Sequence, residues 1–448
     1  MKRLFGTDGI RGEAGKYPLD SATVAKLGSA LARFFGARNT DSPSFVIGRD
    51  TRLSGPEIES ALRAGLEAEG AKVVSAGIMT TPGVAFLVAS RSFNAGLVIS
   101  ASHNPFEDNG IKVFTDSGRK LDDGSEAEVE SLMDSAPDIG TGQIHAAADE
   151  DAGEMESGYK RHLISQFPGL SLEGLRIVVD CANGAASHIA PEVLSVLGAE
   201  VIAINCSPNG TNINAGCGSM HMEVLRAAVR ESGADVGVAF DGDADRALFT
   251  DELGNIVDGD GVLWLVAKRL DAGGLLGDRR VIVATVMSNV GLELALKDSG
   301  IEMLRADVGD RYVLETLLAT GAAVGGEQSG HVIFPRVSLV GDGIVTALNV
   351  LNAMTETGRP LSELLSGFEK FPQILVNVKV REKIPFETIT AIAEEKRAIE
   401  TTLEGRGRLL LRYSGTENLA RVMIEGPDQS EIEMLANTLA VRISESLS

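Results

Sequence analysis

The sequence predicts an α/β protein of several domains. At 448 residues the chain is long enough for roughly three domains, and four are equally admissible. Over most of its length, short apolar strand patterns alternate with helical patterns, which is typical of α/β layers. Beyond Phe371 the pattern changes, and the remaining residues predict a small α+β domain. We therefore expect three similar mixed α/β domains followed by a C-terminal α+β domain.

The first domain is expected over residues 1–155. Its alternating signals favour a largely parallel sheet, because strands separated by helices usually pair in parallel. Residues 138–158 lose the pattern and are rich in glycine, alanine and acidic side chains, so we interpret them as a linker. The expected elements are helices over residues 21–35 and 56–68 and strands over residues 44–48, 72–75 and 95–99.

Two further α/β domains are expected over residues 156–255 and 256–368. The second domain begins with a buried-type strand at 175–180, and its last strand is expected at 236–240. In each of the three domains a Gly- or Asn-rich loop follows an apolar strand, which indicates a repeated architecture. The other expected elements are strands over residues 200–204, 280–284 and 302–306 and helices over residues 262–270 and 291–298.

The C-terminal α+β domain is expected over residues 369–448. Residues 374–380 alternate in polarity, as in a half-exposed strand. The other expected elements are strands over residues 408–412 and 420–424 and helices over residues 386–401 and 431–447.

Composition narrows the function classes. A net charge of −22 repels nucleic acid at long range, and 4% aromatic residues leave few platforms for stacking bases. No apolar run approaches the ~18 residues of a membrane helix, and the first residues lack the apolar segment of a signal peptide. We therefore expect a cytoplasmic protein that binds neither nucleic acid nor membrane. The acidity still admits a phosphorylated small-molecule substrate, and the sequence leaves a homodimer open.

The loop after the expected strand at 95–99 carries a candidate nucleophile, Ser102. The carboxyl ends of such strands are where open α/β sheets bind ligands. The run Asp108–Gly110 predicts a hairpin turn, and the strand that follows it carries Lys112. The adjacent His103 alone would suggest an acyl-transfer role for the serine.

Three aspartates alternate with other residues directly after the expected strand at 236–240. Asp241, Asp243 and Asp245 can all point at one hard cation, and oxygen ligands favour magnesium, calcium or manganese over zinc. An EF-hand is rejected because Arg246 stands where the sharp turn of that loop requires glycine. A phosphatase with an aspartate nucleophile stays open, as does a solvated acidic turn, although three carboxylates at close range favour a cation.

Two polar loops later in the chain offer groups that bind sugar phosphates. Gly325–His331 carries a carboxylate, an amide, a hydroxyl and an imidazole, a set suited to sugar hydroxyls. Arg412–Asn418, with Arg421 shortly after it, combines hydroxyls, backbone amides and guanidinium groups into a candidate phosphate cradle. Either pattern taken alone is also typical of an ordinary surface loop or hairpin turn.

Three arginines near the start of the chain are further basic candidates. They are Arg11, Arg49 and Arg52. Most surface arginines take no part in catalysis, so we retain only Arg11 as a candidate.

Taken together, these motifs resemble the α-D-phosphohexomutase superfamily along essentially the whole chain. The serine loop, the aspartate triplet, the sugar loop and the phosphate loop occur in the order of that family. Within the superfamily the chain is similar to the bacterial phosphoglucosamine mutases rather than to the phosphomannomutase/phosphoglucomutase relatives. That narrower resemblance rests on Phe5–Gly12, Asn212–Asn214, Cys217–Ser219, Val308–Val313 and Gln328.

The resemblance implies a fold, an activity and a set of roles. Four domains would surround a central cleft. The enzyme, an isomerase, would interconvert glucosamine 6-phosphate and glucosamine 1-phosphate through a phosphoserine and a bisphosphorylated sugar, supplying amino-sugar precursors of the cell wall. Its cofactors would be Mg²⁺ and a sugar bisphosphate as the activating phosphoryl donor.

Each motif residue takes an implied role from the family. The serine becomes the phosphoryl carrier, so His103 is interpreted as a neighbour that shapes the loop. The implied roles are phosphoserine for Ser102, magnesium ligation for Ser102, Asp241, Asp243 and Asp245, proton transfer for Lys112 and His331, assistance at the reacting phosphate for Arg11 and Arg246, sugar contacts for Glu327 and Ser329, and binding of the non-reacting phosphate for Arg412, Ser414, Gly415, Thr416 and Arg421.

The chain departs from the family pattern in the phosphate loop. Family members carry prolines at the positions of Tyr413 and Asn418, and without two fixed φ angles we expect a looser loop. Two other functions stay open. One is a phosphomannomutase/phosphoglucomutase with the same centre, and the other is a catalytically silent sugar-phosphate-binding protein, which would require a damaged centre.

Overall fold

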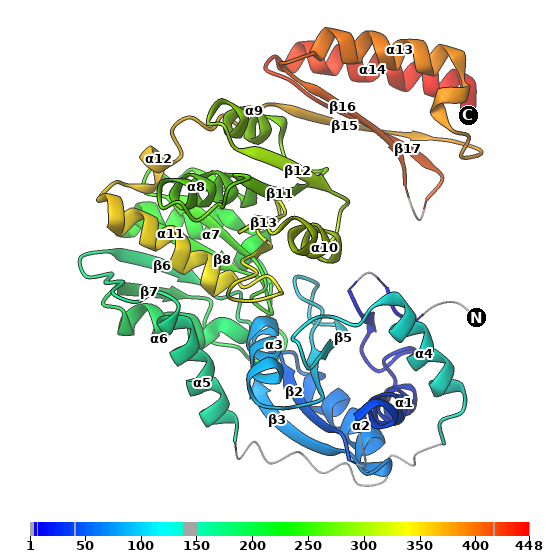
Figure 1. Ribbon diagram of the computed structural model, residues 1–448, viewed down its shortest axis with the longest axis vertical. Coiled ribbons are helices and arrows are strands. Elements are labelled where there is room, and N and C mark those ends of the chain that lie inside the picture. Colours follow the sequence, from blue (N-terminus) through cyan, green and yellow to red (C-terminus); the bar gives the residue numbers. More distant parts are fainter. Residues whose placement is uncertain (1–3, 7, 40–41, 138–150, 415–416, 448) are drawn as a thin grey trace. The chain divides into compact units, whose positions relative to one another are not determined.

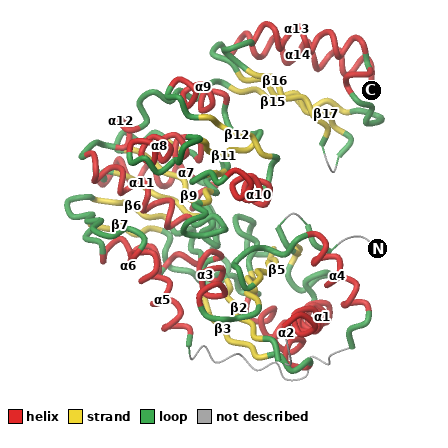
Figure 2. The backbone as a smooth tube through the Cα atoms, in the orientation of Figure 1, coloured by secondary structure: helices red, strands yellow, loops and turns green. Residues whose placement is uncertain are grey.

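The computed structural model describes residues 4–6, 8–39, 42–137, 151–414 and 417–447. The chain divides into two compact units. Unit 1 comprises Met1–Met287 and Met303–Ser366, and unit 2 comprises Ser288–Glu302 and Gly367–Ser448. Helices and strands alternate along unit 1, as Figures 1 and 2 show. Among the described residues, no helix is both long enough and apolar enough to cross a bilayer.

The first sheet of unit 1 carries the serine loop. Its elements are β1 (Ile10–Glu13), α1 (Ser21–Asn39), β2 (Ser44–Arg49), α2 (Gly55–Ala68), β3 (Lys72–Ile78), α3 (Thr81–Ser90), β4 (Ala95–Ile99), β5 (Asp108–Thr115) and α4 (Asp123–Asp134). The strand order is β1-β5-β4-β2-β3, and the sheet is mixed because β5 runs antiparallel to both β4 and β1. Apolar side chains of α1, α2 and α4 form a core against the sheet. A Cβ at Gly65 of α2 would lie 2.0 Å from the carbonyl oxygen of Ala25, so glycine permits the close approach of α1 and α2.

The predicted hairpin turn at Asp108–Gly110 is wrong. These residues lie inside β5 and pair with β1, so the chain reverses in the preceding residues, after β4. An Asn-Gly pair suggests a turn when only its neighbours in sequence are considered, but here β1 supplies a strand partner. A Cβ at Gly110 would lie 2.6 Å from the carbonyl oxygen of Ser100. The glycine therefore permits the backbone at Ser100 to approach β5 closely, and it does not form a turn.

The second sheet of unit 1 carries the aspartate loop. Its elements are α5 (Ala152–Ser165), β6 (Arg176–Asp180), α6 (Ile189–Val196), β7 (Glu200–Ile204), α7 (Met222–Ser232), β8 (Val236–Phe240), β9 (Ala247–Asp251) and β10 (Ile256–Val257). The strand order is β10-β9-β8-β6-β7, with β6 parallel to β7 and β8. β8 is not the last strand, contrary to expectation, because the aspartate loop turns the chain back into the antiparallel β9.

The predicted linker at 138–158 is wrong where the structure describes it. Residues from Ala152 onward belong to α5, whereas 138–150 lie outside the described residues. Met155, Tyr159 and Leu163 recur at helical spacing and are buried, which gives this acidic segment an apolar stripe.

The third sheet of unit 1 carries the predicted sugar loop. Its elements are α8 (Gly259–Ala272), β11 (Val281–Thr285), β12 (Glu302–Ala306), α10 (Asp310–Thr320), β13 (Gly325–Gly326), β14 (Val332–Ile333), α11 (Gly343–Thr357) and α12 (Leu361–Leu364). The strand order is β12-β11-β13-β14. β13 and β14 pair antiparallel, so the predicted sugar loop is the tip of a short hairpin.

Unit 2 is a small α+β domain. Its elements are α9 (Val290–Asp298), β15 (Gln373–Lys379), α13 (Thr390–Leu403), β16 (Arg408–Tyr413), β17 (Leu419–Glu425) and α14 (Gln429–Leu447). The sheet has the order β15-β17-β16 with antiparallel pairs, and apolar side chains of α13 and α14 form its core. Asn289 Nδ2 at the start of α9 donates to the Phe371 carbonyl oxygen at 3.0 Å. The segment around α9 therefore packs with the C-terminal part of the chain.

The start of α11 is fixed by a buried carboxylate, Asp342. Its Oδ1 accepts hydrogen bonds from the amides of Ile344 and Val345, and its Oδ2 accepts one from Tyr159 Oη at 2.6 Å. The next amide, that of Gly343, donates to the Ala244 carbonyl oxygen in the aspartate loop. Burial raises the pKa of Asp342 to about 6. The carboxyl group thus binds its proton more tightly in the folded chain than in the unfolded chain.

We predict that Asp342→Asn changes the pH dependence of stability. Because the folded pKa is raised, the contribution of Asp342 is full below the unfolded pKa near 3.8 and is lost as the pH rises through about 6. Asparagine caps a helix as well as aspartate does and does not titrate. Between about pH 4 and about pH 7, wild type should lose about 2 kcal/mol more free energy of unfolding than Asp342→Asn.

Urea unfolding followed by the fluorescence of Trp264 measures this difference. The tryptophan is buried in α8, which packs against α11, so its fluorescence reports on this part of unit 1. Parallel pH profiles for wild type and Asp342→Asn would contradict the prediction.

Candidate active site

The loop between β4 and β5 presents Ser102. The residue is buried, with 1% of its surface exposed, and its backbone is left-handed with φ 52°. The Ser102 amide donates to Ser100 Oγ at 2.9 Å, and Ser100 Oγ donates to Asp50 Oδ2 at 2.6 Å. A left-handed backbone is costly for a residue with a side chain, so these bonds hold a strained turn.

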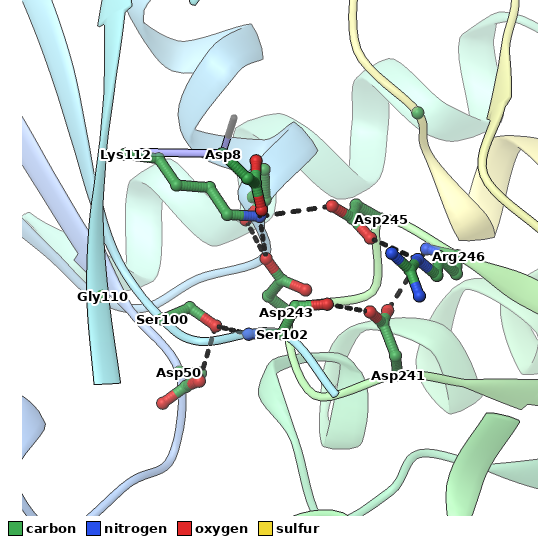
Figure 3. A network of polar contacts seen from close by, with 12 residues as sticks. Asp8, Asp50, Ser100, Ser102, Gly110, Lys112, Asp241, Asp243, Asp245 and Arg246 are labelled. Atoms are coloured by element: carbon green, nitrogen blue, oxygen red, sulfur yellow. Dashed lines mark hydrogen bonds and ion pairs between the residues drawn. The ribbon is translucent and has the colours of Figure 1, made fainter. Parts of the chain in front are cut away.

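The aspartate loop follows β8, as predicted, and meets the serine loop. Ser102 Oγ donates to Asp241 Oδ2 at 2.5 Å, and Figure 3 shows the two loops face to face. Asp241, Asp243 and Asp245 are buried, and one carboxylate oxygen of each lies within 4.8 Å of the others. Two loops from different sheets therefore bring a hydroxyl and three carboxylates to one point.

Asp241 and Asp245 differ in their electrostatic surroundings. Burial, and then the charges of Asp245 and Asp243, raise the pKa of Asp241 well above its ordinary value. Burial also acts to raise the pKa of Asp245, but Lys112 and other cationic neighbours hold it well below the ordinary value. Asp241 is therefore the less compensated of these two carboxylates.

The oxygens of this loop fit a hard divalent cation. Asp243 Oδ1 and Asp245 Oδ1 are buried and accept no hydrogen bond from any described residue. A buried carboxylate oxygen left without a partner is costly, and oxygen-only ligands are those that Mg²⁺ and Mn²⁺ prefer. Thr81 Oγ1, at the start of α3, donates to Asp243 Oδ2 at 2.5 Å. That bond fixes the orientation of the carboxylate and leaves its other oxygen for a cation.

Lys112 reaches from β5 into the aspartate loop. Its side chain is 1% exposed, and Nζ lies 2.8 Å from Asp243 Oδ2 and 3.3 Å from Asp245 Oδ2. The Oδ2 atom of Asp8 lies 3.4 Å away. Burial acts to lower the pKa of Lys112, but the three carboxylates raise it well above the ordinary value. Lys112 is therefore an ammonium group that neutralises part of the loop's charge.

His331 joins the site from the third sheet. Its Nδ1 lies 3.7 Å from Asp245 Oδ1, and its Nε2 accepts a hydrogen bond from the Gly341 amide at 3.1 Å. A nitrogen that accepts this bond carries no proton, so the ring proton is assigned to Nδ1, on the side of Asp245.

The two predicted arginines of unit 1 lie at the same site. Arg246 Nη1 is 3.3 Å from His103 Nδ1, and that ring nitrogen is also 3.3 Å from Ser102 Oγ. His103 thus lies between the serine and an arginine. Arg11 pairs with Asp8, the same carboxylate that approaches the buried lysine.

The predicted sugar loop is tied to the aspartate loop. Glu327 Oε1 accepts a hydrogen bond from the Gly309 amide at 3.1 Å, and Ser329 is exposed at the tip. The carbonyl oxygen of Gly330 accepts a bond from the Ala247 amide at 3.1 Å, directly after the aspartate loop. Gly330 has φ 93°, a conformation that favours glycine.

The predicted phosphate loop lies in unit 2, at the end of the β16–β17 hairpin. Arg412 and Arg421 are cross-strand partners. Arg421 Nη2 lies 3.5 Å from Ser414 Oγ, and its Nε is buried without a partner among the described residues. These three predicted residues are therefore together, whereas Gly415 and Thr416 lie outside the described residues.

Tyr413, at the edge of the phosphate loop, has a hydrogen bond and a ring contact within unit 2. Its hydroxyl donates to the Ile384 carbonyl oxygen at 2.5 Å, and its ring stacks on Phe386 with centroids 4.1 Å apart. On the other side of the loop, the carbonyl oxygen of Asn418 accepts a bond from the Val380 amide at 3.0 Å. Both strands that flank the loop are thus anchored.

Several residues of the site were not predicted from the sequence. Thr81 and Lys120, the latter bonded to Asp310 at 2.5 Å and paired with Asp8, carry no local signal. Asp8 and Asp310 lie inside segments that carried the family resemblance, which was the one signal available for them.

Models of one family match nearly the whole chain. In chain order they are described as phosphoglucomutase/phosphomannomutase alpha/beta/alpha domain I at residues 2–138, domain II at 157–254, domain III at 258–371 and the C-terminal domain at 375–441.

Bacterial relatives indicate which branch of this family the chain resembles. A phosphoglucosamine mutase of Citrifermentans bemidjiense is 47% identical over 451 residues, which cover 100% of this chain and 99% of the relative. One of Geotalea daltonii is 48% identical over 454 residues with the same coverage. The chain belongs to the phosphoglucosamine mutase family. Membership makes it an enzyme, an isomerase of the phosphohexomutase superfamily, and confirms the predicted superfamily and enzyme class.

Solved structures of other phosphohexomutases share the fold. A phosphoglucomutase/phosphomannomutase family protein from Burkholderia thailandensis has a TM-score of 0.80 and 24% identity, covering 100% of this chain and 98% of its own. N-acetylphosphoglucosamine mutase of Aspergillus fumigatus, solved with GlcNAc-6P and magnesium, has a TM-score of 0.67 and 19% identity, covering 99% and 96%. The four domain models and these likenesses confirm the predicted fold class.

We predict that Thr81→Val weakens divalent-cation binding. Valine has nearly the shape of threonine but cannot donate to Asp243, and the loss of a bond that orients a metal ligand typically lowers affinity about 10-fold or more. Titration with Mn²⁺, followed by electron paramagnetic resonance, measures this affinity directly. Thr81→Ser keeps the hydroxyl and should bind Mn²⁺ within about threefold of wild type. Wild-type affinity in Thr81→Val would contradict the assigned role.

Proposed function

We propose that the enzyme interconverts glucosamine 6-phosphate and glucosamine 1-phosphate and so supplies amino-sugar nucleotide precursors. One observation carries the proposal. Ser102 Oγ, held in a strained turn, faces three buried carboxylates that fit a divalent cation. The relatives named phosphoglucosamine mutase, 47–48% identical over the full chain, support the choice of sugar.

The reaction uses Ser102 as a phosphoryl carrier. The O1 hydroxyl of glucosamine 6-phosphate attacks the phosphorus of phosphorylated Ser102, so the O1–P bond forms and the P–Oγ bond breaks. The proton released from O1 compensates the proton that Oγ takes up. The 1,6-bisphosphate then turns round, and its 6-phosphoryl group passes to Oγ. Glucosamine 1-phosphate leaves, and the phosphoserine is restored.

The aspartate loop is proposed as a magnesium site. Asp241, Asp243 and Asp245 would hold the ion together with an oxygen of phosphorylated Ser102. When bound, the cation would neutralise charge on the phosphoryl oxygens. Asp243 Oδ1 and Asp245 Oδ1, which accept no hydrogen bond from the described residues, support this assignment, and the related fungal mutase was solved with magnesium. A sugar bisphosphate is proposed as the donor that first phosphorylates the serine, and a variant of the same fungal mutase was solved with glucose 1,6-bisphosphate.

The cationic side chains around Ser102 are proposed to act on the reacting groups. Lys112 and His331 stay the candidates for moving protons between Oγ and the sugar hydroxyl. Arg11 and Arg246 would hold the oxygens of the reacting phosphate, which a charge-assisted fork suits. Their convergence on one point of unit 1 supports these roles.

The remaining predicted contacts complete the proposal. Glu327 and Ser329 would bind sugar hydroxyls, and Arg412, Ser414, Gly415, Thr416 and Arg421 would bind the non-reacting phosphate. The shared cleft, the boundaries at 1–155, 156–255, 256–368 and 369–448, the cytoplasmic location and the homodimer stay predictions.

A substrate panel tests the proposed function. With Mg²⁺ and glucose 1,6-bisphosphate present, we expect kcat/KM on glucosamine 6-phosphate to exceed that on glucose 6-phosphate and mannose 6-phosphate at least about tenfold. Ser102→Ala, which cannot carry the phosphoryl group, should be inactive on all three. The family models bear the names phosphoglucomutase and phosphomannomutase, so a preference for glucose or mannose phosphate would replace the proposed sugar. Activity retained by Ser102→Ala would remove the phosphoserine route.

A further inference from the structure

Arg52 is a fully buried cation that lies beneath the serine loop. Its side chain has 0% of its surface exposed, and Nε donates to Asp50 Oδ2 at 2.8 Å. The same Asp50 oxygen accepts the bond from Ser100 Oγ that supports the Ser102 amide. A buried charge is costly unless it is paired and hydrogen-bonded, so this arrangement demands a specific set of partners.

The two remaining nitrogens of the guanidinium, Nη1 and Nη2, donate hydrogen bonds to backbone carbonyls of the serine loop and of β5. Nη2 donates to the carbonyl oxygens of Ser102 and Asn104, each at 2.9 Å. Nη1 donates to the carbonyl oxygen of Asp108 at 3.0 Å and to that of Pro105. One planar group therefore gathers three carbonyls of the turn that presents the nucleophile and the carbonyl of Asp108, the first residue of β5.

A second side chain, on the loop between β7 and α7, bonds two of these carbonyls. Asn214 Nδ2 donates to the carbonyl oxygens of Ser102 at 2.9 Å and of Asn104 at 3.0 Å. A Cβ at Gly242 of the aspartate loop would lie 2.6 Å from the same Ser102 oxygen. The backbone of the nucleophile is thus held between Arg52, Asn214 and the aspartate loop.

We propose that Arg52 and Asn214 are positioning residues that fix the serine loop so that Ser102 Oγ stays aimed at the aspartate loop. The inference rests on the proposed phosphoryl exchange at Ser102 and extends it to residues that hold the backbone. Arg52 bonds only main-chain oxygens of the loop, and its charge is paired with Asp50. It therefore acts through the backbone and does not bind substrate.

Arginine is needed here for its geometry rather than its charge. The guanidinium presents five N–H donors in a rigid plane, whereas lysine presents three donors on one atom. A lysine side chain in place of Arg52 can pair with Asp50. Its single nitrogen cannot replace both Nη1 and Nη2, each of which donates to two backbone carbonyls. The loop would then be free to move the nucleophile, and a displacement of about 1 Å can lower a rate about 100-fold.

The test compares Arg52→Lys with Arg49→Lys. Arg49 ends β2 in the same segment, and its Nε donates to Glu59 of α2, so it is a matched substitution outside the serine loop. Stopped samples analysed by intact-mass spectrometry give the rate at which glucose 1,6-bisphosphate phosphorylates Ser102. Steady-state assays give kcat and KM, and circular dichroism confirms the fold. Because phosphorylation is measured with the bisphosphate alone, the result does not depend on which sugar phosphate the enzyme isomerises.

We expect Arg52→Lys to fold and to phosphorylate Ser102 about 100-fold more slowly, with kcat lowered by a similar factor and KM within about threefold of wild type. Arg49→Lys should behave as wild type. A folded Arg52→Lys with wild-type phosphorylation and kcat, or one whose loss lies in KM, would overturn the proposal. A wild-type protein that the bisphosphate does not phosphorylate would instead overturn the proposed function.

Asn214→Ser keeps the test decisive if Arg52→Lys does not fold. Serine is too short to span both carbonyls, while the arginine cluster stays intact. We expect a loss of about tenfold or more in kcat and in the phosphorylation rate, with KM within about threefold of wild type. Wild-type rates in a folded Asn214→Ser would overturn the proposal.

Discussion

Three carboxylates confined to one buried loop are the constraint on which the rest of the site depends. One oxygen of each lies within 4.8 Å of the others, and such charges are stable in a protein interior only when other groups compensate them. The protein supplies those groups from outside the loop. Lys112 and Thr81 bond to Asp243, and Ser102 bonds to Asp241. All three come from the first sheet and its helices, so the charge of the loop is one force that holds two sheets together.

The residues around the aspartate loop are themselves held in place by hydrogen bonds. Asp342 starts α11 and, through the neighbouring Gly343 amide, bonds to the aspartate loop. The Gly341 amide fixes the ring of His331 beside Asp245. Beneath the serine, Arg52 gathers the turn. Buried polar groups of this kind are favourable only when all are satisfied, so each bond limits the positions open to the next. Asp243 Oδ1 and Asp245 Oδ1 accept no hydrogen bond from the described residues, and they mark where a cation fits.

Much of the fold could be predicted from the sequence because apolar strand patterns are local. Continuous apolar runs identified β4 and β8, and the polar residues directly after them identified Ser102 and the aspartates. The failures have a different physical origin. Asp108–Gly110 has the sequence of a turn, but these residues pair with β1, which is distant in sequence. Residues from Ala152 onward have the composition of a linker, but their apolar side chains are buried in the folded chain.

Site residues were missed where their role depends on burial or distant contacts. Arg52 was passed over as one more surface arginine, and no local pattern distinguishes it from Arg49. Only the folded chain shows that the first is fully buried beneath the serine loop. The roles of Thr81 and Lys120 likewise depend on hydrogen bonds to residues far away in sequence, namely Asp243 and Asp310. The site residues that could be predicted were those that directly follow a recognisable strand in the sequence.

In the proposed site, phosphorylated Ser102 and the three aspartates hold one cation. The most direct measurement is electron–nuclear double resonance on the phosphorylated protein with Mn²⁺ bound. We expect phosphorus hyperfine coupling to the bound Mn²⁺ from the phosphoserine, and its loss in Ser102→Ala. Tightly bound Mn²⁺ without phosphorus coupling in the phosphorylated protein would place the metal away from Ser102 and rule out the shared site.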